Sequence, residues 1–314
     1  MNVSETVKIG LPRAFLYHRY STLWKSFFKE LGIETVVSPP TNKKILEDGT
    51  ALAVDETCLS TKIYFGHVKY LIGKCDYILL PRITRWGRNR DMCTKFQALY
   101  DLTCNVFRNT DQKFLVCNID FNAKIDEEQA LEQVGETLGF GKKEIRKAYK
   151  KAKKEEAEVF KKRLKLQESK WDKEGTKIIV AAHSYVLKDA YIGKQILDYL
   201  EQMGVQVIRA DLVDKKSALR KSEEMSPTMK WELNREIAGG IETYKNKVDG
   251  VILLSVFPCG PDSMTNEMII RKNKDIPILH LVIDAQEGMA GVETRLESFL
   301  DIIEFRKGEQ GNGH

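Results

Sequence analysis

Six cysteines offer the most distinctive chemistry in this sequence. They stand at positions 58, 75, 93, 104, 117 and 259 of a chain of 314 residues. The first residues lack the basic start and apolar run of an export signal, so the chain is expected to be cytoplasmic, where thiols stay reduced. The cysteines are therefore expected to be buried small side chains, metal ligands or nucleophiles rather than disulfides.

Three of the cysteines occupy positions where a metal-binding or reactive thiol is expected. Cys259 directly follows the apolar run Val251–Val256, in a loop whose backbone is restricted by two prolines and a glycine. Cys93 lies beyond an arginine-rich loop, and Cys58 precedes a helix expected at 60–72, whose N-terminus would stabilise a thiolate. Because ligands of wound α/β sheets bind at loops that follow the carboxyl ends of strands, these three are expected to be functional.

The other three cysteines have more ordinary surroundings. Cys117 alternates within an expected strand, Cys75 precedes one, and Cys104 lies on an apolar helical face, so each is expected to be buried and inert. Three thiolates without a C-x-x-C pair do not make a typical zinc site, which takes four closely spaced ligands. Soft thiolates otherwise select iron–sulfur clusters or copper(I), and a cubane held by three cysteines would leave one iron open.

Short apolar runs alternate with helical apolar spacing in both halves of the chain, which predicts parallel, wound sheets. In the first half, strands are expected at 7–11, 33–37, 77–80 and 114–117, and helices at 20–31 and 60–72. In the second half, strands are expected at 178–181, 205–209, 251–256 and 278–283, and helices at 190–203 and 294–303. The unbroken apolar run at 251–256 is typical of a strand buried on both faces.

A charged helical segment separates the two halves, and Gly139–Gly141 interrupts it, so at least two helices are expected there. The predicted fold class is α/β, with two wound, Rossmann-like parallel-sheet domains joined by this charged helical connector. The expected divisions are an N-terminal α/β domain at 1–125, the connector at 126–175, a C-terminal α/β domain at 176–307 and a disordered tail at 308–314.

Composition and charge exclude several classes of protein. The chain is 42% hydrophobic and 30% charged, and no apolar run reaches the ~18 residues of a membrane span. The net charge of +5 is concentrated in residues 141–173, which hold 14 basic and 6 acidic side chains and are expected to form a solvated helix face rather than a nucleic-acid site. No G-x-G-x-x-G, Walker A or hydrolase motif is present, so standard NAD or ATP loops and hydrolysis are not expected.

Several motifs together resemble one protein family. They are Ile9-Gly10-Leu11-Pro12-Arg13-Ala14, Cys58 with Gly66-His67-Val68, Cys93 with Phe96-Gln97, and Cys259-Gly260-Pro261-Asp262-Ser263. These segments resemble the domain attached to, or encoded beside, CoA-substrate enzyme activases, a relative of the 2-hydroxyacyl-CoA dehydratase and benzoyl-CoA reductase subunits. The resemblance covers residues 7 to about 303, and Asp284 and the segment 291–299 match the usual ending of the family.

The resemblance implies that Cys58, Cys93 and Cys259 are the metal ligands of a [4Fe–4S] cluster, with a double-cubane [8Fe–9S] cluster as the alternative. It also implies that an ATP-dependent activase on a separate chain delivers low-potential electrons, which pass to a substrate at the cluster in an anaerobic organism. A homodimer, or a heterodimer with a related subunit, is the expected assembly. Whether Cys75, Cys104 or Cys117 join the cluster stays open.

Other functions also stay open. Ala285 and Gln286 stand where the family is expected to have an acidic residue and a histidine, Met289 replaces an acid, and Thr94 replaces a proline. These departures favour a non-catalytic electron carrier or scaffold that bears a cluster, and a double-cubane reductase is a second alternative. Thiols more than ~10 Å apart would instead favour a metabolite-binding module without a cluster.

Residues near the cysteines are candidates for contacting the cluster or a substrate. His67 would donate a hydrogen bond to cluster sulfur and tune its potential, or would be structural. Asp262 and Ser263 would orient the Cys259 loop through side-chain hydrogen bonds, or would face a substrate.

Other candidates lie farther from the cysteines. Arg82 and Arg85 belong to an arginine-rich segment, with Arg88 and Arg90, that would bind CoA phosphates or an acidic activase surface, or would be a solvated basic loop. Asp284, His183 and Tyr185 follow expected strand ends, where they would line a cleft or be exposed.

Overall fold

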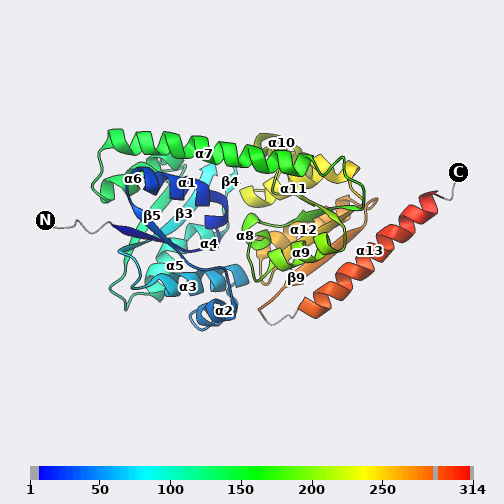
Figure 1. Ribbon diagram of the computed structural model, residues 1–314, viewed down its shortest axis with the longest axis horizontal. Helices are drawn as coiled ribbons and strands as arrows, with labels where there is room; N and C mark the ends of the chain where they lie inside the picture. The colour runs from blue at the N-terminus through cyan, green and yellow to red at the C-terminus, as the bar shows by residue number, and fades with distance from the viewer. Residues whose placement is uncertain (1–6, 286–288, 312–314) are drawn as a thin grey trace. The chain divides into compact units, whose positions relative to one another are not determined.

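The computed structural model describes residues 7–285 and 289–311, and the chain divides into two compact units. Unit 1 comprises residues 1–162 and 230–232, and unit 2 comprises residues 163–229 and 233–314. Each unit is built on its own sheet of mainly parallel strands, with helices packed on both sides (Figure 1). This arrangement confirms the predicted α/β class with two wound, Rossmann-like sheets.

Unit 1 contains the first five strands. Its elements are β1 (Lys8–Leu11), α1 (Tyr17–Glu30), β2 (Glu34–Val37), α2 (Lys43–Thr50), α3 (Leu59–Leu71), β3 (Tyr77–Gly87), β4 (Arg90–Asp91), α4 (Thr94–Gln97), α5 (Leu99–Val106), β5 (Lys113–Asp120), α6 (Glu127–Thr137) and residues 142–162 of α7 (Lys142–Glu168). The sheet order is β2-β1-β3-β5 through parallel pairs, and β4 pairs antiparallel with the end of β3. The carboxyl ends of β1 and β3 therefore form the point at which the strand order reverses, where wound sheets bind ligands.

Strand β3 is longer than predicted. It was expected to end at Pro81, but it continues to Gly87 and turns into β4, so the segment 82–90 is a strand and a hairpin rather than a loop. Beyond Ile78 the strand pairs with β5 and no longer with β1. A residue without an N–H donor is tolerated at such an open edge, which explains why the proline does not end the strand.

Helix α2 was not predicted from the sequence. The side chain of Asn42 caps it by accepting a hydrogen bond from the Ile45 N–H at 3.0 Å. Gly49 and Gly66 let α2 and α3 pack closely, because a Cβ atom at Gly49 would lie 1.8 Å from the carbonyl oxygen of Lys62, and one at Gly66 would lie 1.9 Å from that of Ile45. A helix of 8 residues is marginal alone, so this packing is what forms it.

The charged segment between the two sheets contains helices α6 and α7, with a break near Gly139 as expected. Asp126 and Gln129 form a reciprocal capping box at the start of α6, and Gly139 adopts a φ of +88° after its end. Helix α6 and residues 142–162 of α7 fall within unit 1, and the rest of α7 falls within unit 2.

Unit 2 contains the last four strands. Its elements after α7 are β6 (Lys177–Ala181), α8 (Ser184–Leu187), α9 (Gly193–Gln202), β7 (Gln206–Arg209), α10 (Lys215–Met225), α11 (Glu232–Tyr244, of which Glu232 belongs to unit 1), the short 3₁₀ helix Lys245–Lys247, β8 (Gly250–Val256), α12 (Gly260–Lys272), β9 (Ile278–Ile283) and α13 (Met289–Gly311). All pairs in the sheet are parallel, in the order β7-β6-β8-β9. The order reverses between β6 and β8, so the loops after these two strands flank the expected ligand position of this sheet.

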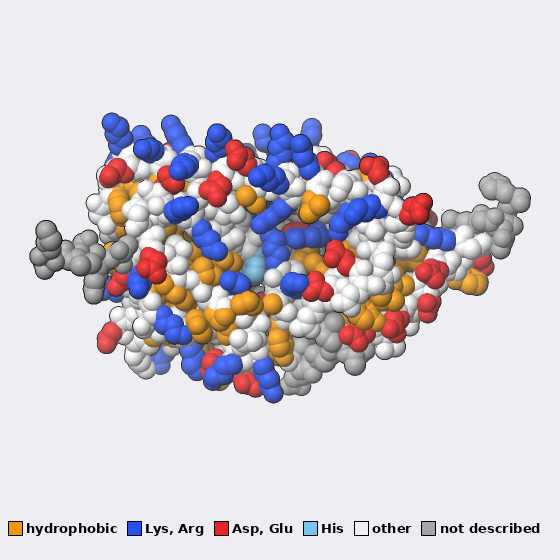
Figure 2. All heavy atoms as spheres, in the orientation of Figure 1, with side chains coloured by type: hydrophobic (Ala, Val, Ile, Leu, Met, Phe, Trp, Pro, Cys, Tyr) orange, Lys and Arg blue, Asp and Glu red, His pale blue; other side chains and the backbone are white. Residues whose placement is uncertain are grey.

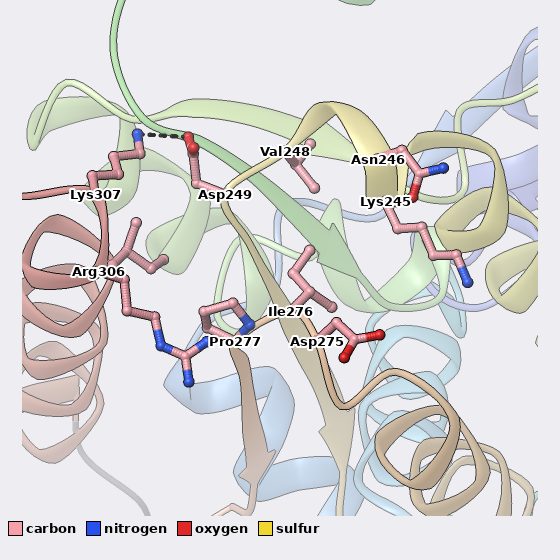
Figure 3. Close-up of a pocket in the computed structure, with 10 residues that line it drawn as sticks. Lys245, Asn246, Val248, Asp249, Asp275, Ile276, Pro277, Arg306 and Lys307 are labelled. Atoms are coloured by element: carbon pink, nitrogen blue, oxygen red, sulfur yellow. Dashed lines mark ion pairs between the residues drawn. The ribbon is translucent and has the colours of Figure 1, made fainter. Parts of the chain in front are cut away.

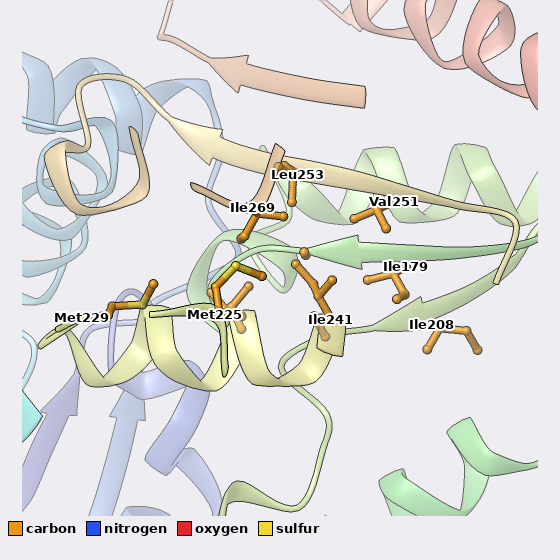
Figure 4. Close-up of a cluster of buried hydrophobic side chains, with 12 residues drawn as sticks. Ile179, Ile208, Met225, Met229, Ile241, Val251, Leu253 and Ile269 are labelled. Carbon is orange, nitrogen blue, oxygen red and sulfur yellow. The ribbon is translucent and has the colours of Figure 1, made fainter. Parts of the chain in front are cut away.

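The core of unit 2 lies between the sheet and helices α10, α11 and α12. Side chains from three strands face side chains from these helices (Figure 4). They are Ile179, Ile208, Val251 and Leu253 on the strands, and Met225, Ile241 and Ile269 on the helices. Strand β8 is buried along its whole length, as its apolar run predicted.

The C-terminal helix is also longer than predicted. Helix α13 begins at Met289 and ends at Gly311, so residues 308–311 of the expected disordered tail are helical, and residues 312–314 lie outside the described part of the chain. Within that described part, we find no helix whose length and apolar character would let it cross a membrane.

Candidate functional site

Each of the three cysteines singled out from the sequence is the residue immediately before a helix. Cys58 is the N-cap of α3, Cys93 is the N-cap of α4, and Cys259 is the N-cap of α12. All three are partly buried, and all have extended backbone angles. A helix begins with backbone N–H groups that lack helical partners, so the three thiols share one kind of local position, directly before the first turn of a helix.

The Cys58 thiol contacts the first turn of its helix. Its Sγ lies 3.1 Å from the Thr61 hydroxyl oxygen, and its carbonyl accepts the N–H groups of Thr61 and Lys62. Either of these two groups can donate the hydrogen bond, and the contact holds the thiol against the first turn of α3.

The structure assigns the three thiols to two different units. Cys58 and Cys93 belong to unit 1, and Cys259 belongs to unit 2. Among the described residues, no group of three or more cysteine, histidine, aspartate or glutamate side chains is arranged to hold a metal ion. Cysteine sulfur is the donor that iron–sulfur clusters use. Neither unit contains all three of these thiols.

The remaining cysteines have the properties of structural thiols. Burial raises the pKa of the Cys75 thiol to about 11 and that of the Cys117 thiol to about 12. Burial also raises the pKa of Cys104, which lies beside Tyr100. Thiols that stay protonated at neutral pH are poor ligands and poor nucleophiles. Of the three, Cys117 is buried as expected, whereas Cys75 and Cys104 are only partly buried.

A buried polar cluster in unit 2 surrounds the start of α12. The carboxylate of Asp262 accepts hydrogen bonds from His183 Nε2 at 2.7 Å and from Asn234 Nδ2 at 2.8 Å. The Cys259 thiol also donates to it. Burial works to raise the pKa of Asp262, but His183 and these hydrogen bonds outweigh burial and hold the pKa below its usual range.

This cluster lies at the expected ligand position of the second sheet. His183 follows β6 and is the residue immediately before α8. Cys259 and Asp262 follow β8. The sequence pointed to the strand ends but gave no signal for Asn234, because an asparagine within a polar helix has no distinctive spacing. The structure thus links Cys259, through Asp262, to two side chains that hold the carboxylate in place.

The neighbouring candidates contact their own loops. The Ser263 hydroxyl donates to the Cys259 carbonyl at 2.8 Å, so it orients the cysteine loop as one of the sequence alternatives proposed. Asp284 accepts a hydrogen bond from the Ala285 N–H at 2.6 Å at the end of β9. The expected departure at Gln286 lies outside the described residues.

His67 is buried within unit 1. Its Nε2 lies 2.9 Å from the Thr41 hydroxyl and its Nδ1 lies 2.8 Å from the Ser38 hydroxyl. Burial, aided by the nearby charges of His18 and Arg13, lowers its pKa to about 3, so the ring is neutral at physiological pH. Both ring nitrogens are therefore engaged by hydroxyls that follow β2, and the histidine ties that loop to α3.

The arginine segment is held mainly by protein oxygen atoms. Arg82 donates to the Gln97 carbonyl at 3.0 Å, and Arg85 pairs with Asp91. Arg90 Nε lies 3.0 Å from both carboxylate oxygens of Glu232, which is fully buried. Both Arg90 and Glu232 belong to unit 1. The sequence could not foresee this pair because its partners lie 142 residues apart.

The fold and the site together define a class of two-unit α/β proteins with wound sheets and partly buried thiols at helix starts. The chain belongs to the family described as the CoA enzyme activase uncharacterised domain, which matches residues 8–213. This match confirms the family suggested by the motifs. Cys58 and Cys93 lie inside the matched segment, whereas Cys259 and Asp262 lie beyond it. No curated protein matches the chain.

Proposed function

We propose that this chain is an iron–sulfur protein of the activase-related group, with Cys58, Cys93 and Cys259 as the ligands of a [4Fe–4S] cluster. The observation that carries the proposal is the shared position of the three thiols, each partly buried and each immediately before a helix. Since these thiols come from two units, the proposal requires both units to supply ligands to one cluster.

A bound cubane cluster would supply one-electron chemistry at low potential, with electrons from a separate ATP-dependent activase. The residues of the chain would prepare the ligands for this role. Each of the three cysteines lies directly before a helix, and the Thr61 hydroxyl lies 3.1 Å from the Cys58 sulfur. Asp262 holds the side chain of Cys259. Phe257 and Met264, two positions before and five positions after Cys259 in the sequence, have 54% and 60% of their area exposed.

A non-catalytic electron carrier is the alternative form of this function, and the departure from the expected family pattern at Ala285 favours it. A cavity of about 290 Å³ is lined by residues such as Asp249, Pro277 and Arg306 (Figure 3). Asp249 and Pro277 immediately precede β8 and β9, whereas Cys259 follows β8, so this cavity lies at the opposite edge of the sheet. This cavity is therefore separate from the sheet edge that carries Cys259, and it takes no part in the proposed cluster site.

The test is iron and acid-labile sulfide analysis after anaerobic purification. We expect about four iron atoms per chain in the wild type. Cys58→Ala, Cys93→Ala and Cys259→Ala would each lose the iron, while Cys104→Ala, which removes a thiol outside the proposed ligand set, would retain it. About eight iron atoms would instead support the double-cubane alternative. No iron after reconstitution, or equal iron in all four variants, would refute the proposed ligand set.

A further inference from the structure

Most basic residues in the part of α7 that lies in unit 1 are of two kinds. One kind binds acids on its own or neighbouring helices and fixes α7 to the unit. These pairs are Lys142 with Glu132 at 3.0 Å, Arg146 with Glu132 at 3.6 Å, Lys151 with Glu30 at 2.6 Å and Lys153 with Glu127 at 2.6 Å. The acids come from α1 and α6, so these residues are accounted for by the fold.

The second kind forms a row that we call the lysine stripe. Its members are Lys143, Lys147, Lys150, Lys154 and Lys161, all exposed. Within the described residues, none of the five forms an ion pair. At about 100° and 1.5 Å per residue, they lie within an arc of about 60° along about 27 Å of the helix. Figure 2 shows Lys and Arg side chains gathered over α7.

The stripe opposes the stability of its own helix. Lys143 and Lys147, and Lys150 and Lys154, are four residues apart, and Lys147 and Lys150 are three apart. Like charges at these spacings repel one another on a helix surface. An acidic surface docked on the stripe would remove this repulsion, whereas solvent only screens it.

Acidic residues border the stripe on one side. Glu144, Glu155 and Glu158 are exposed and lie between about 60° and 120° around the helix from Lys143, in a sector that also holds Lys151 and Lys162. A border with charges of both signs matches a protein surface of mixed charge better than the uniformly negative backbone of a polyphosphate. The stripe also has neither the arginines nor the aromatic side chains that accompany nucleic-acid sites.

We propose that the lysine stripe is a docking surface for an acidic face of a protein partner. Resting on the function proposed above, we assign this partner as the ATP-dependent activase. The charge rows would steer the encounter and set the orientation of the complex, because exposed charges act mainly on association rate and register.

The test compares two variants with the same change in net charge. The triple variant Lys147→Glu, Lys150→Glu, Lys154→Glu reverses the centre of the stripe. The matched control Lys173→Glu, Lys216→Glu, Lys274→Glu reverses three exposed lysines of unit 2. Binding of a purified activase to each full-length chain is measured by biolayer interferometry at low and high salt, with circular dichroism to verify folding.

We expect the stripe variant to bind about 10- to 100-fold more weakly, chiefly through slower association, and the control to stay within about threefold of wild type. Wild-type binding should weaken as salt rises. Zero-length carbodiimide cross-linking, which joins lysines to carboxylates in contact, should map to the stripe. If the charge-reversed variant fails to fold, the triple variant Lys147→Gln, Lys150→Gln, Lys154→Gln replaces it. We expect this variant to bind the activase more weakly than wild type, but by a smaller factor.

Three outcomes would overturn the proposal. Equal binding by wild type and stripe variant would reject the stripe but leave the activase as partner, so the proposed function would stand. No binding of wild type to the activase at low salt would reject both the docking surface and the activase partner. Stripe-dependent binding to a 30-base-pair DNA duplex, with activase binding unchanged, would reject a protein partner in favour of nucleic acid.

Discussion

Replacement of His67 should weaken the pH dependence of the free energy of unfolding of unit 1 between pH 6.5 and pH 3. Its folded-state pKa of about 3 lies well below the usual histidine value of 6.5, so the unfolded chain binds a proton that the folded chain excludes. The stabilising contribution is therefore fully present above pH 6.5 and is lost as pH falls from 6.5 towards 3. The slope is about 1.4 kcal/mol per pH unit, or about 2 kcal/mol at pH 5.

The variant His67→Gln keeps a polar side chain that does not titrate. At pH 7.5 it should be less stable than wild type by about 1–3 kcal/mol, since the hydroxyls of Ser38 and Thr41 lose their ring partners. Below pH 6.5 the two stabilities should converge, because only the wild type loses the histidine contribution.

The assay is native-state hydrogen exchange between pH 7.5 and 5, which reports local stability in each unit separately. Protection of α3 should show the convergence, while β8 in unit 2 serves as an internal control. Parallel pH profiles for wild type and His67→Gln would refute the reasoning. A His67 resonance that titrates near pH 6.5 in the folded protein would refute it as well.

Three further changes test other contacts. Arg90→Ala should destabilise unit 1 by about 3 kcal/mol in urea unfolding, since it leaves the buried Glu232 without its ion-pair partner. The double variant Arg90→Ala, Glu232→Gln should recover part of the lost stability. In the wild type, the lowered pKa of Asp262 stabilises the folded state above pH 3.8, and this contribution is lost as pH falls through the folded-state pKa of the carboxyl. Asp262→Asn should abolish this contribution. Identical acid unfolding of both proteins would contradict this. Gly66→Ala should lower the melting temperature, because its Cβ would meet the Ile45 carbonyl, and unchanged melting would show that α2 moves aside.

The order of strands and helices was largely predictable from the sequence. Apolar runs such as Val251–Val256 identify buried strands because an unbroken apolar pattern has no solvent-facing side. Glycines that follow helices, such as Gly32 and Gly204, adopt positive φ angles and mark helix ends reliably. These signals are local, so they survive in the sequence without knowledge of the fold.

Elements that depend on neighbours were not predictable. Strand β3 continues through Pro81 because β1 no longer pairs with it there, which only the sheet register reveals. Helix α2 forms because Gly49 and Gly66 let it pack against α3. In both cases a long-range contact overrides a local signal.

The sequence by itself determined the α/β class and the family, since each rests on local patterns and residue types. The functional role of Cys58, Cys93 and Cys259 stays a prediction from the same patterns. Only the tertiary structure decided which side chains hold the candidate site. It joins Asp262 to His183 and Asn234, and it engages the nitrogens of His67 with hydroxyls. These hydrogen bonds span 26 to 79 positions of the chain, and such pairings arise only when the sheets bring distant strand ends together.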